Sequence, residues 1–103
     1  MMQDKLPHDQ IEAFCRKWQI AEFALFGSAV YGNFRPDSDI DALVTFDPAA
    51  QWTLFDHVDM RMELETLFNR DVDLVSRRGI ERSRNYIRRQ EILDSAQVIY
   101  AIA

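Results

Sequence analysis

Two aspartates on one predicted strand are the residues of this sequence best placed to do chemistry. Asp39 and Asp41 stand in the stretch DIDALVTF (residues 39–46), which alternates as a strand does, so both side chains point to one face. Aspartate is poorly suited to strands and two carboxylates on one face repel each other, so we expect a compensating cation. Because Mg²⁺ prefers oxygen ligands, the pair predicts a divalent metal site.

A second pair of acids follows on another predicted strand. Asp71 and Asp73 alternate with Val72 and Leu74 in the short apolar segment DVDLV (residues 71–75). If this strand pairs beside the first, one of its acids joins the first two. Three carboxylates at the edge of a sheet can hold two metal ions, which stabilise the attacking and leaving oxygens of an in-line phosphoryl displacement.

A Gly-Ser pair stands between an apolar strand and the first acidic strand. The strand EFALF (residues 22–26) ends at Gly27, and Ser28 begins a predicted helical turn over residues 28–31. Backbone N–H groups and a hydroxyl at a helix start attract anions, so we interpret the pair as a phosphate cradle, although alone it is an ordinary turn and cap. It is not a Walker loop, because no Gly-Lys-Ser/Thr follows the strand, and it is not a Rossmann fingerprint, because Gly27 and Gly32 do not form G-x-G-x-x-G.

Apolar residues at helical spacing predict two helices that flank these strands. The first has the apolar stripe Ile11, Phe14, Cys15 and Trp18. Asp9 and Glu12 have the spacing of a capping box at its start. The second covers residues 53–69, and its apolar arc is wide enough to contact the sheet and one further surface.

The order of predicted elements favours one α/β domain over residues 1–103, in which a small mixed sheet is covered by helices. Residues 77–95 are predicted to be mostly helical with a break near Gly79, and residues 97–102 to form a last strand or a tail packed on the core. The hydrophobic fraction of 48% is typical of a globular protein.

Charge is unevenly distributed along the chain. The net charge of −5 argues against general nucleic-acid binding, so no direct nucleic-acid partner is expected. The last 27 residues nevertheless hold six basic and three acidic side chains. Their basic run RRGIERSRNYIRR, from Arg77 to Arg89, is either a solvated helix face or a docking surface for an anionic substrate or acidic partner.

Several residues that do chemistry elsewhere are predicted to be structural here. Cys15 is the only cysteine, which excludes an internal disulfide and a zinc thiolate cluster, and we expect it in the core. His8 and His57 are isolated and are expected at the surface. Core or interface positions are expected for Trp18, Trp52 and Tyr86. No membrane partner is expected, and the absence of a spanning run or signal pattern predicts a cytoplasmic protein.

The spacing of these motifs resembles a known superfamily. One signature of the DNA polymerase β-like nucleotidyltransferases is G-S-x(10)-D-x-D. The sequence is similar to it, with Gly27-Ser28, then ten residues, then Asp39-Ile40-Asp41. LFGSAVYGNFRPDSDIDALVTF resembles the minimal branch of that superfamily, the MNT proteins. RDVDLVS resembles the segment that carries their third catalytic acid, and YIRRQEILDSAQVIYA resembles their usual ending, so the resemblance covers nearly the whole chain.

The resemblance implies a role for each acid. Asp39 and Asp41 would bind two Mg²⁺ ions. Asp73 would complete the site and help to activate the acceptor hydroxyl. Asp71 lies on the same predicted face as Asp73, so the choice between these two acids stays open.

The resemblance also implies the nucleotide contacts. Gly27 and Ser28 would hold the triphosphate of ATP. The family often has a second basic residue in the segment that reads SAVYG here, whereas this chain has only Arg35 nearby.

The resemblance further implies a protein partner. A chain of this length has little room for an acceptor-binding domain, and MNT proteins pair with HEPN-domain ribonuclease toxins. They transfer AMP from ATP to a toxin tyrosine, release pyrophosphate and so act as antitoxins. Two alternatives stay open: the same chemistry on a small molecule or another protein, and a non-catalytic module that neutralises a toxin by covering it.

Overall fold

The computed structural model describes residues 6–27 and 39–102 of the chain. Its elements are α1 (His8–Lys17), β1 (Ile20–Phe26), β2 (Ile40–Phe46), α2 (Leu54–Phe68), β3 (Val72–Ser76), α3 (Arg77–Glu81), α4 (Tyr86–Ser95) and β4 (Gln97–Ala101). The helical turn predicted from Ser28 onward and the loop after it lie outside the described residues.

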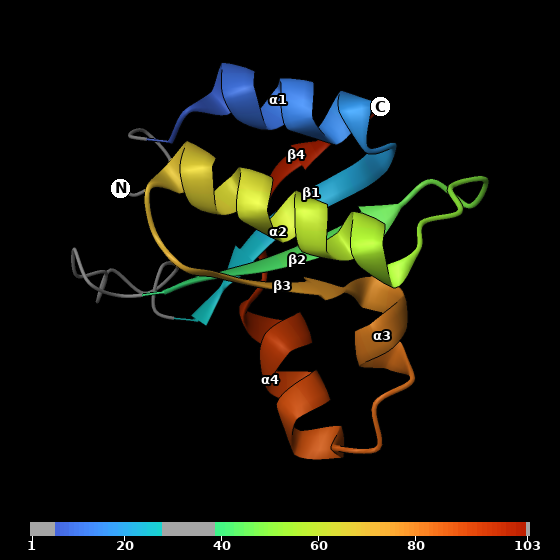
Figure 1. The fold of residues 1–103 in the computed structure, drawn as a ribbon. Coiled ribbons are helices and arrows are strands. Elements are labelled where there is room, and N and C mark those ends of the chain that lie inside the picture. The colour runs from blue at the N-terminus through green and yellow to red at the C-terminus, as the bar shows by residue number, and fades with distance from the viewer. Residues whose placement is uncertain (1–5, 28–38, 103) are drawn as a thin grey trace.

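The four strands form one mixed sheet in the order β3-β2-β1-β4. β1 runs antiparallel to β2 and to β4, whereas β2 and β3 are parallel. A parallel pair needs a crossover connection, and α2 supplies it between β2 and β3 (Figure 1). The predicted α/β fold with a small mixed sheet is therefore confirmed.

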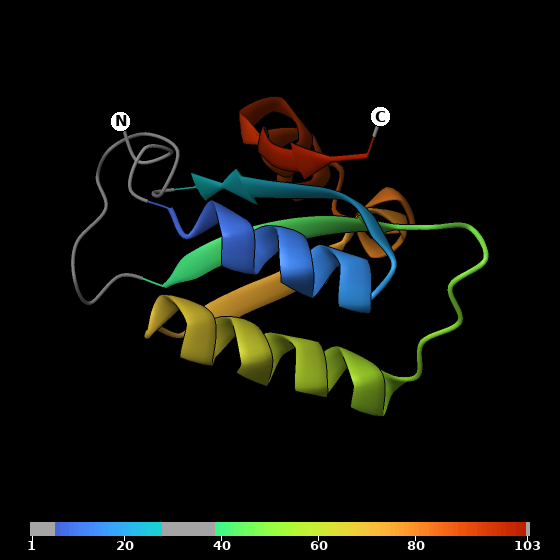
Figure 2. The same ribbon diagram turned by 90° about the horizontal axis from the view of Figure 1, so that it is seen from above.

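Helices cover both faces of this sheet. α1 and α2 lie on one face, and α3 and α4 lie on the other (Figure 2). The alternating residues of β2 divide accordingly, because Ile40 and Val44 belong to the core under α1 and α2. Leu43 packs instead with Ile80 of α3 and Ile92 of α4. No helix within the described ranges is long and apolar enough to cross a membrane.

α1 begins without the capping box that its sequence indicated. The helix starts at His8 with Pro7 at the N-cap, and no side chain caps it. Asp9 therefore lies inside the first turn and cannot act as the cap, while Glu12 forms an ion pair with Arg16 at 2.5 Å. The predicted capping box is wrong. The buried stripe is confirmed for Ile11, Phe14 and Cys15.

α2 has the capping box that α1 lacks. The Thr53 hydroxyl accepts a hydrogen bond from the Asp56 backbone N–H at 3.2 Å, and the Asp56 carboxylate accepts one from the Thr53 N–H at 2.9 Å. One side of the helix meets the sheet through the buried Met60 and Leu64. The other side stays open to solvent, where Phe55 is 82% exposed. The wide apolar arc therefore extends beyond the sheet contact.

The C-terminal helical region is interrupted later than predicted. Gly79 lies inside α3, and its N–H donates to the hydroxyl of Ser76, which caps that helix at 3.0 Å. α4 receives its own cap from Asn85, whose side-chain oxygen accepts from the Arg88 N–H at 3.1 Å. The interruption therefore falls at residues 82–85, before the second cap, and not at the glycine.

Burial determines the reactivity of Cys15. The side chain is fully buried, and burial, followed by the nearby charge of Glu12, raises the pKa of its thiol to about 12. Because the thiolate is the reactive form, we expect no reaction of the native protein with Ellman's reagent at neutral pH. The same protein denatured in guanidinium chloride should react at once. Rapid labelling of the native protein would show that α1 leaves the sheet easily.

Candidate active site

β1 ends in a glycine that lies against an acid of the next strand. Gly27 has a φ of +72°, in the left-handed region that favours glycine. A Cβ atom at this position would lie 2.5 Å from Oδ2 of Asp41. Both the backbone conformation and this contact therefore require glycine, which brings the main chain at the end of β1 close to a carboxylate.

Two of the predicted acids face each other across the parallel strands. Asp41 of β2 pairs in register with Asp73 of β3 and, on its other side, with Phe26 of β1. Neighbouring strands lie about 4.8 Å apart, so the two carboxylates emerge side by side. Asp41 is half-buried, whereas the side chain of Asp73 is 52% exposed. The predicted pairing of the two acidic strands is therefore present.

The other two predicted acids lie where these strands begin. Asp39 is exposed and directly precedes β2, and Asp71 is exposed and directly precedes β3. The carbonyl oxygen of Asp71 accepts a hydrogen bond from the Ile40 N–H at 2.9 Å, which joins the two strand starts. Within residues 6–27 and 39–102, no three acidic, histidine or cysteine side chains converge on one metal position. The structure thus brings together one acid from each strand, and the participation of Asp39 stays a prediction.

Negative charge accumulates around Asp41. Burial raises the pKa of its carboxyl group, the charges of Asp73 and Asp39 raise it further, and Arg88 opposes them. A raised pKa means that the ionised carboxylate is disfavoured in its surroundings, and a bound cation would offset this cost. Carboxylate oxygens on neighbouring strands are the donor set of a hard divalent ion, so the residues present fit Mg²⁺.

A cavity of about 540 Å³ opens over the paired acids. Its volume is in the range of small-molecule sites, roughly 300–1,000 Å³. The sheet contributes Phe26, Gly27, Asp41 and Asp73, and α4 contributes Arg88, Glu91, Ile92, Asp94 and Ser95.

The contribution of α4 to this cavity was only partly foreseen. The sequence indicated a basic run there, but not that the acids Glu91 and Asp94 line the same cavity as Arg88. The signal was present, because residues 88, 91, 92 and 95 have the spacing of one helix face. Only the fold shows that this face is turned toward β2 and β3.

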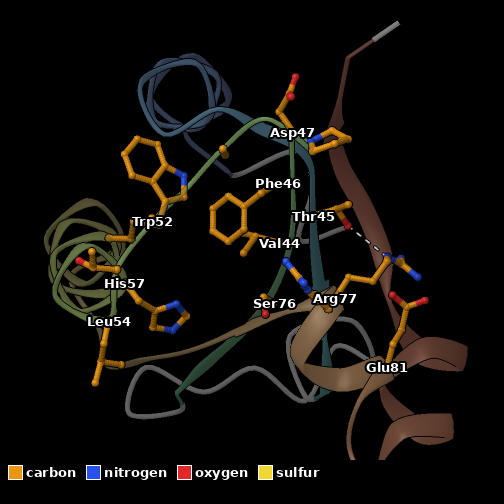
Figure 3. A pocket seen from close by; sticks show the side chains of 15 residues that line it. Val44, Thr45, Phe46, Asp47, Trp52, Leu54, His57, Ser76, Arg77 and Glu81 are labelled. Atoms are coloured by element: carbon orange, nitrogen blue, oxygen red, sulfur yellow. Dashed lines mark hydrogen bonds between the residues drawn. The ribbon is translucent and has the colours of Figure 1, made fainter.

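A second cavity, of about 600 Å³, lies at the opposite ends of β2 and β3 (Figure 3). Several of its polar side chains have partners within the protein. Arg77 donates to the Thr45 hydroxyl at 3.1 Å and pairs with Glu22 at 3.4 Å. Nε2 of His57 lies 3.0 Å from the Leu74 carbonyl oxygen, and the residue is half-buried where full exposure was expected. The first cavity, with its paired carboxylates, is therefore the better candidate for a metal-binding active site than the second.

Relatives of known sequence point to the same class of site. A family model described as "Nucleotidyltransferase domain" matches residues 8–99. Over 64 residues the chain is 31% identical to a protein of Methanocaldococcus jannaschii named "Putative protein adenylyltransferase MJ1379". This match covers 62% of the chain and 64% of that relative, slightly less than two thirds of its length.

Solved structures share the fold. "Structure of putative minimal nucleotidyltransferase" matches with a TM-score of 0.67 and 32% identity over 87% of this chain and 86% of that one. A toxin-antitoxin crystal structure with AMP-PNP matches with a TM-score of 0.74 and 23% identity, over 94% and 75% of the two chains. A complex of the tri-AMPylated Shewanella oneidensis HEPN toxin with MNT antitoxin matches with a TM-score of 0.65 and 21% identity. This match covers 99% of this chain and 74% of that one.

The last two identities are low enough that they show the fold alone. The family model, in contrast, spans most of the chain and includes every element that lines the cavity. The protein therefore belongs to the nucleotidyltransferase domain family.

Proposed function

We propose that this protein transfers AMP from ATP to a tyrosine hydroxyl of a HEPN-domain ribonuclease toxin and so acts as its antitoxin in the cytoplasm. The observation that carries the proposal is the pairing of Asp41 with Asp73 beside Gly27, under a cavity, in a chain of the nucleotidyltransferase domain family. The shared fold with a toxin-antitoxin complex containing AMP-PNP, and with one containing an AMPylated HEPN toxin, supports the choice of nucleotide and partner.

The nucleotide is held by main-chain groups and by the acids. Gly27 and Ser28 bind the triphosphate in this proposal, which is supported by the close approach of Gly27 to Asp41. Two Mg²⁺ ions are held by the carboxylates of Asp39, Asp41 and Asp73. When bound, Mg²⁺ neutralises the charge that builds on the α-phosphate and the leaving pyrophosphate and lowers the pKa of the acceptor hydroxyl.

The acceptor approaches from the open side of the cavity. Asp73 is the more exposed acid of the pair, so its carboxylate can take the proton of an incoming hydroxyl. The hydroxyl oxygen bonds to the α-phosphorus as the bond to pyrophosphate breaks. At the start of α4, directly before Arg88, Tyr86 and Ile87 are 63% and 70% exposed, which offers a protein partner an apolar surface on the helix that lines the cavity.

The transfer is tested by incubating the protein with Mg²⁺, ATP labelled at the α-phosphate, and the HEPN protein encoded beside it. We expect label on the partner, release of pyrophosphate, and a modified tyrosine in tandem mass spectrometry. A phenylalanine at that partner position should abolish labelling. If a small molecule of a cell extract is labelled and the partner is not, the acceptor is that small molecule and not the toxin. Neutralisation of the toxin without any label would favour the covering mechanism.

Replacement of the paired acids should separate catalysis from folding. Asp41→Asn and Asp73→Asn should each lower the transfer rate by more than about a hundred-fold, because a ligand and charge stabilisation are lost. Without Mg²⁺ the melting temperature should not fall, since Asp41→Asn removes repulsion from a crowded carboxylate. Asp71→Asn is the matched control, with the same change at an exposed position just before β3. An equal loss in that control would overturn the assignment of Asp73.

Replacement of the glycine should destabilise the fold through two separable effects. Gly27→Ala puts a side chain at a φ of +72° and pushes it against Asp41, which should cost about 1–3 kcal/mol of unfolding free energy in urea denaturation. In an Asp41→Ala background only the backbone strain remains, so the cost should fall by about 1 kcal/mol. An unchanged cost would mean that the carboxylate contact does not explain the glycine.

A further inference from the structure

One basic side chain reaches into the acidic cavity. Nη2 of Arg88 lies 3.7 Å from Oδ2 of Asp73. Among the described residues that line the cavity, Arg88 is the only basic one, whereas four carry carboxylates. The cap from Asn85 fixes the turn of α4 on which Arg88 stands.

Other arginines of the basic run have different contacts. Arg89 donates to the Glu81 carbonyl oxygen at 3.4 Å, and its guanidinium lies 5.2 Å from the centre of the Tyr86 ring. Arg77 is bound to Thr45 at the far end of the sheet. Of the run between residues 77 and 89, Arg88 alone lines the cavity over the paired acids.

The contact between Arg88 and Asp73 is easily exchanged. The two side chains are 54% and 52% exposed, and ion pairs of this kind add little net stability. A divalent cation shared by Asp41 and Asp73 carries twice the charge of the guanidinium and competes with it for the same carboxylate. Once the cation binds Asp73, the guanidinium of Arg88 loses this ion-pair partner while it still lines the cavity.

A triphosphate at this site would need positive charge beyond the residues directly after Gly27. The sequence has no lysine or arginine between Lys17 and Arg35, so the segment directly after Gly27 brings no positive charge. A guanidinium binds phosphate oxygens through two parallel hydrogen bonds and keeps its charge at every physiological pH. Arg88 therefore has both the position and the chemistry to fill this need.

We propose that Arg88 has two partners in turn: Asp73 while the site is empty, and the phosphates of the nucleotide once a divalent cation holds Asp73. This role rests on the proposed function, because it requires a nucleotide and a metal at the paired acids. It makes Arg88 a substrate-binding residue whose release from Asp73 couples metal binding to nucleotide binding.

The test measures binding to the purified protein without any acceptor. Arg88→Gln removes the charge, Arg88→Lys keeps it without the paired hydrogen bonds, and Arg84→Gln removes a charge from an exposed residue that does not line the cavity. Isothermal titration calorimetry gives the affinity for Mg²⁺ alone, and for a non-hydrolysable ATP analogue at saturating Mg²⁺. Thermal unfolding by circular dichroism verifies that each variant is folded.

The expected pattern has opposite signs for the two ligands. Arg88→Gln should bind Mg²⁺ a few-fold more tightly, because a competitor is gone, and the analogue about ten-fold more weakly, because a charged contact is lost. Arg88→Lys should bind the analogue with intermediate affinity, and it decides the question alone if Arg88→Gln does not fold. Arg84→Gln should match the unmodified protein in both measurements.

Other outcomes would overturn this role for Arg88. If Arg88→Gln weakens Mg²⁺ binding as well, the arginine only holds Asp73 in place. If both Arg88 variants bind the analogue normally, it does not contact the phosphates. If the unmodified protein binds neither Mg²⁺ nor the analogue, the proposed function fails and this role fails with it, which distinguishes that case from the first two.

Discussion

The parallel register of β2 and β3 is the constraint on which the site depends. It sets Asp41 opposite Asp73 and, one position earlier, sets Ile40 opposite Val72 in the core under α1 and α2. Because side chains alternate along a strand, a slip by one residue would turn the acids into that core and the apolar residues out of it. The burial of hydrophobic residues on one face therefore fixes the spacing of the carboxylates on the other.

This arrangement concentrates negative charge that the fold must tolerate before any ligand binds. Asp41 bears most of it, since it is half-buried and lies beside both Asp73 and Asp39, which together raise its pKa. Two features moderate the repulsion: Asp73 stays open to solvent, and Arg88 lies against it. Elsewhere polar groups are satisfied, because the described residues contain no buried side-chain nitrogen or oxygen without a hydrogen-bond partner. A site that is electrostatically unfavourable when empty is suited to binding a cation.

Much of this architecture was predictable, because it follows from short-range periodicity. Alternation put Asp41 and Asp73 each on the acidic face of its strand, and the order of elements favoured a mixed sheet, whereas the parallel pairing of the two strands is known only from the structure. Helix boundaries were less predictable, since they depend on which side chain forms a cap: Asn85 restarts the helix, while Gly79 lies inside one. The spacing of Arg88 and Glu91 on one helix face could be read from the sequence, but their approach to the paired acids could not, because it depends on how α4 docks on the sheet.

The two halves of the cavity, one on the sheet and one on α4, are held in place by different hydrophobic clusters. The paired acids stand on strands that share the larger core, whereas α4 is held by Ile92 in a smaller cluster with Phe26 and Leu43. A change in the smaller cluster would therefore shift Arg88 and the neighbouring acids of α4 while the paired aspartates keep their register. The strands set the geometry of the paired acids, and the helix adds charged side chains around them. Under the proposed function, nucleotide affinity could for this reason be altered through the packing of α4 without rebuilding the paired acids.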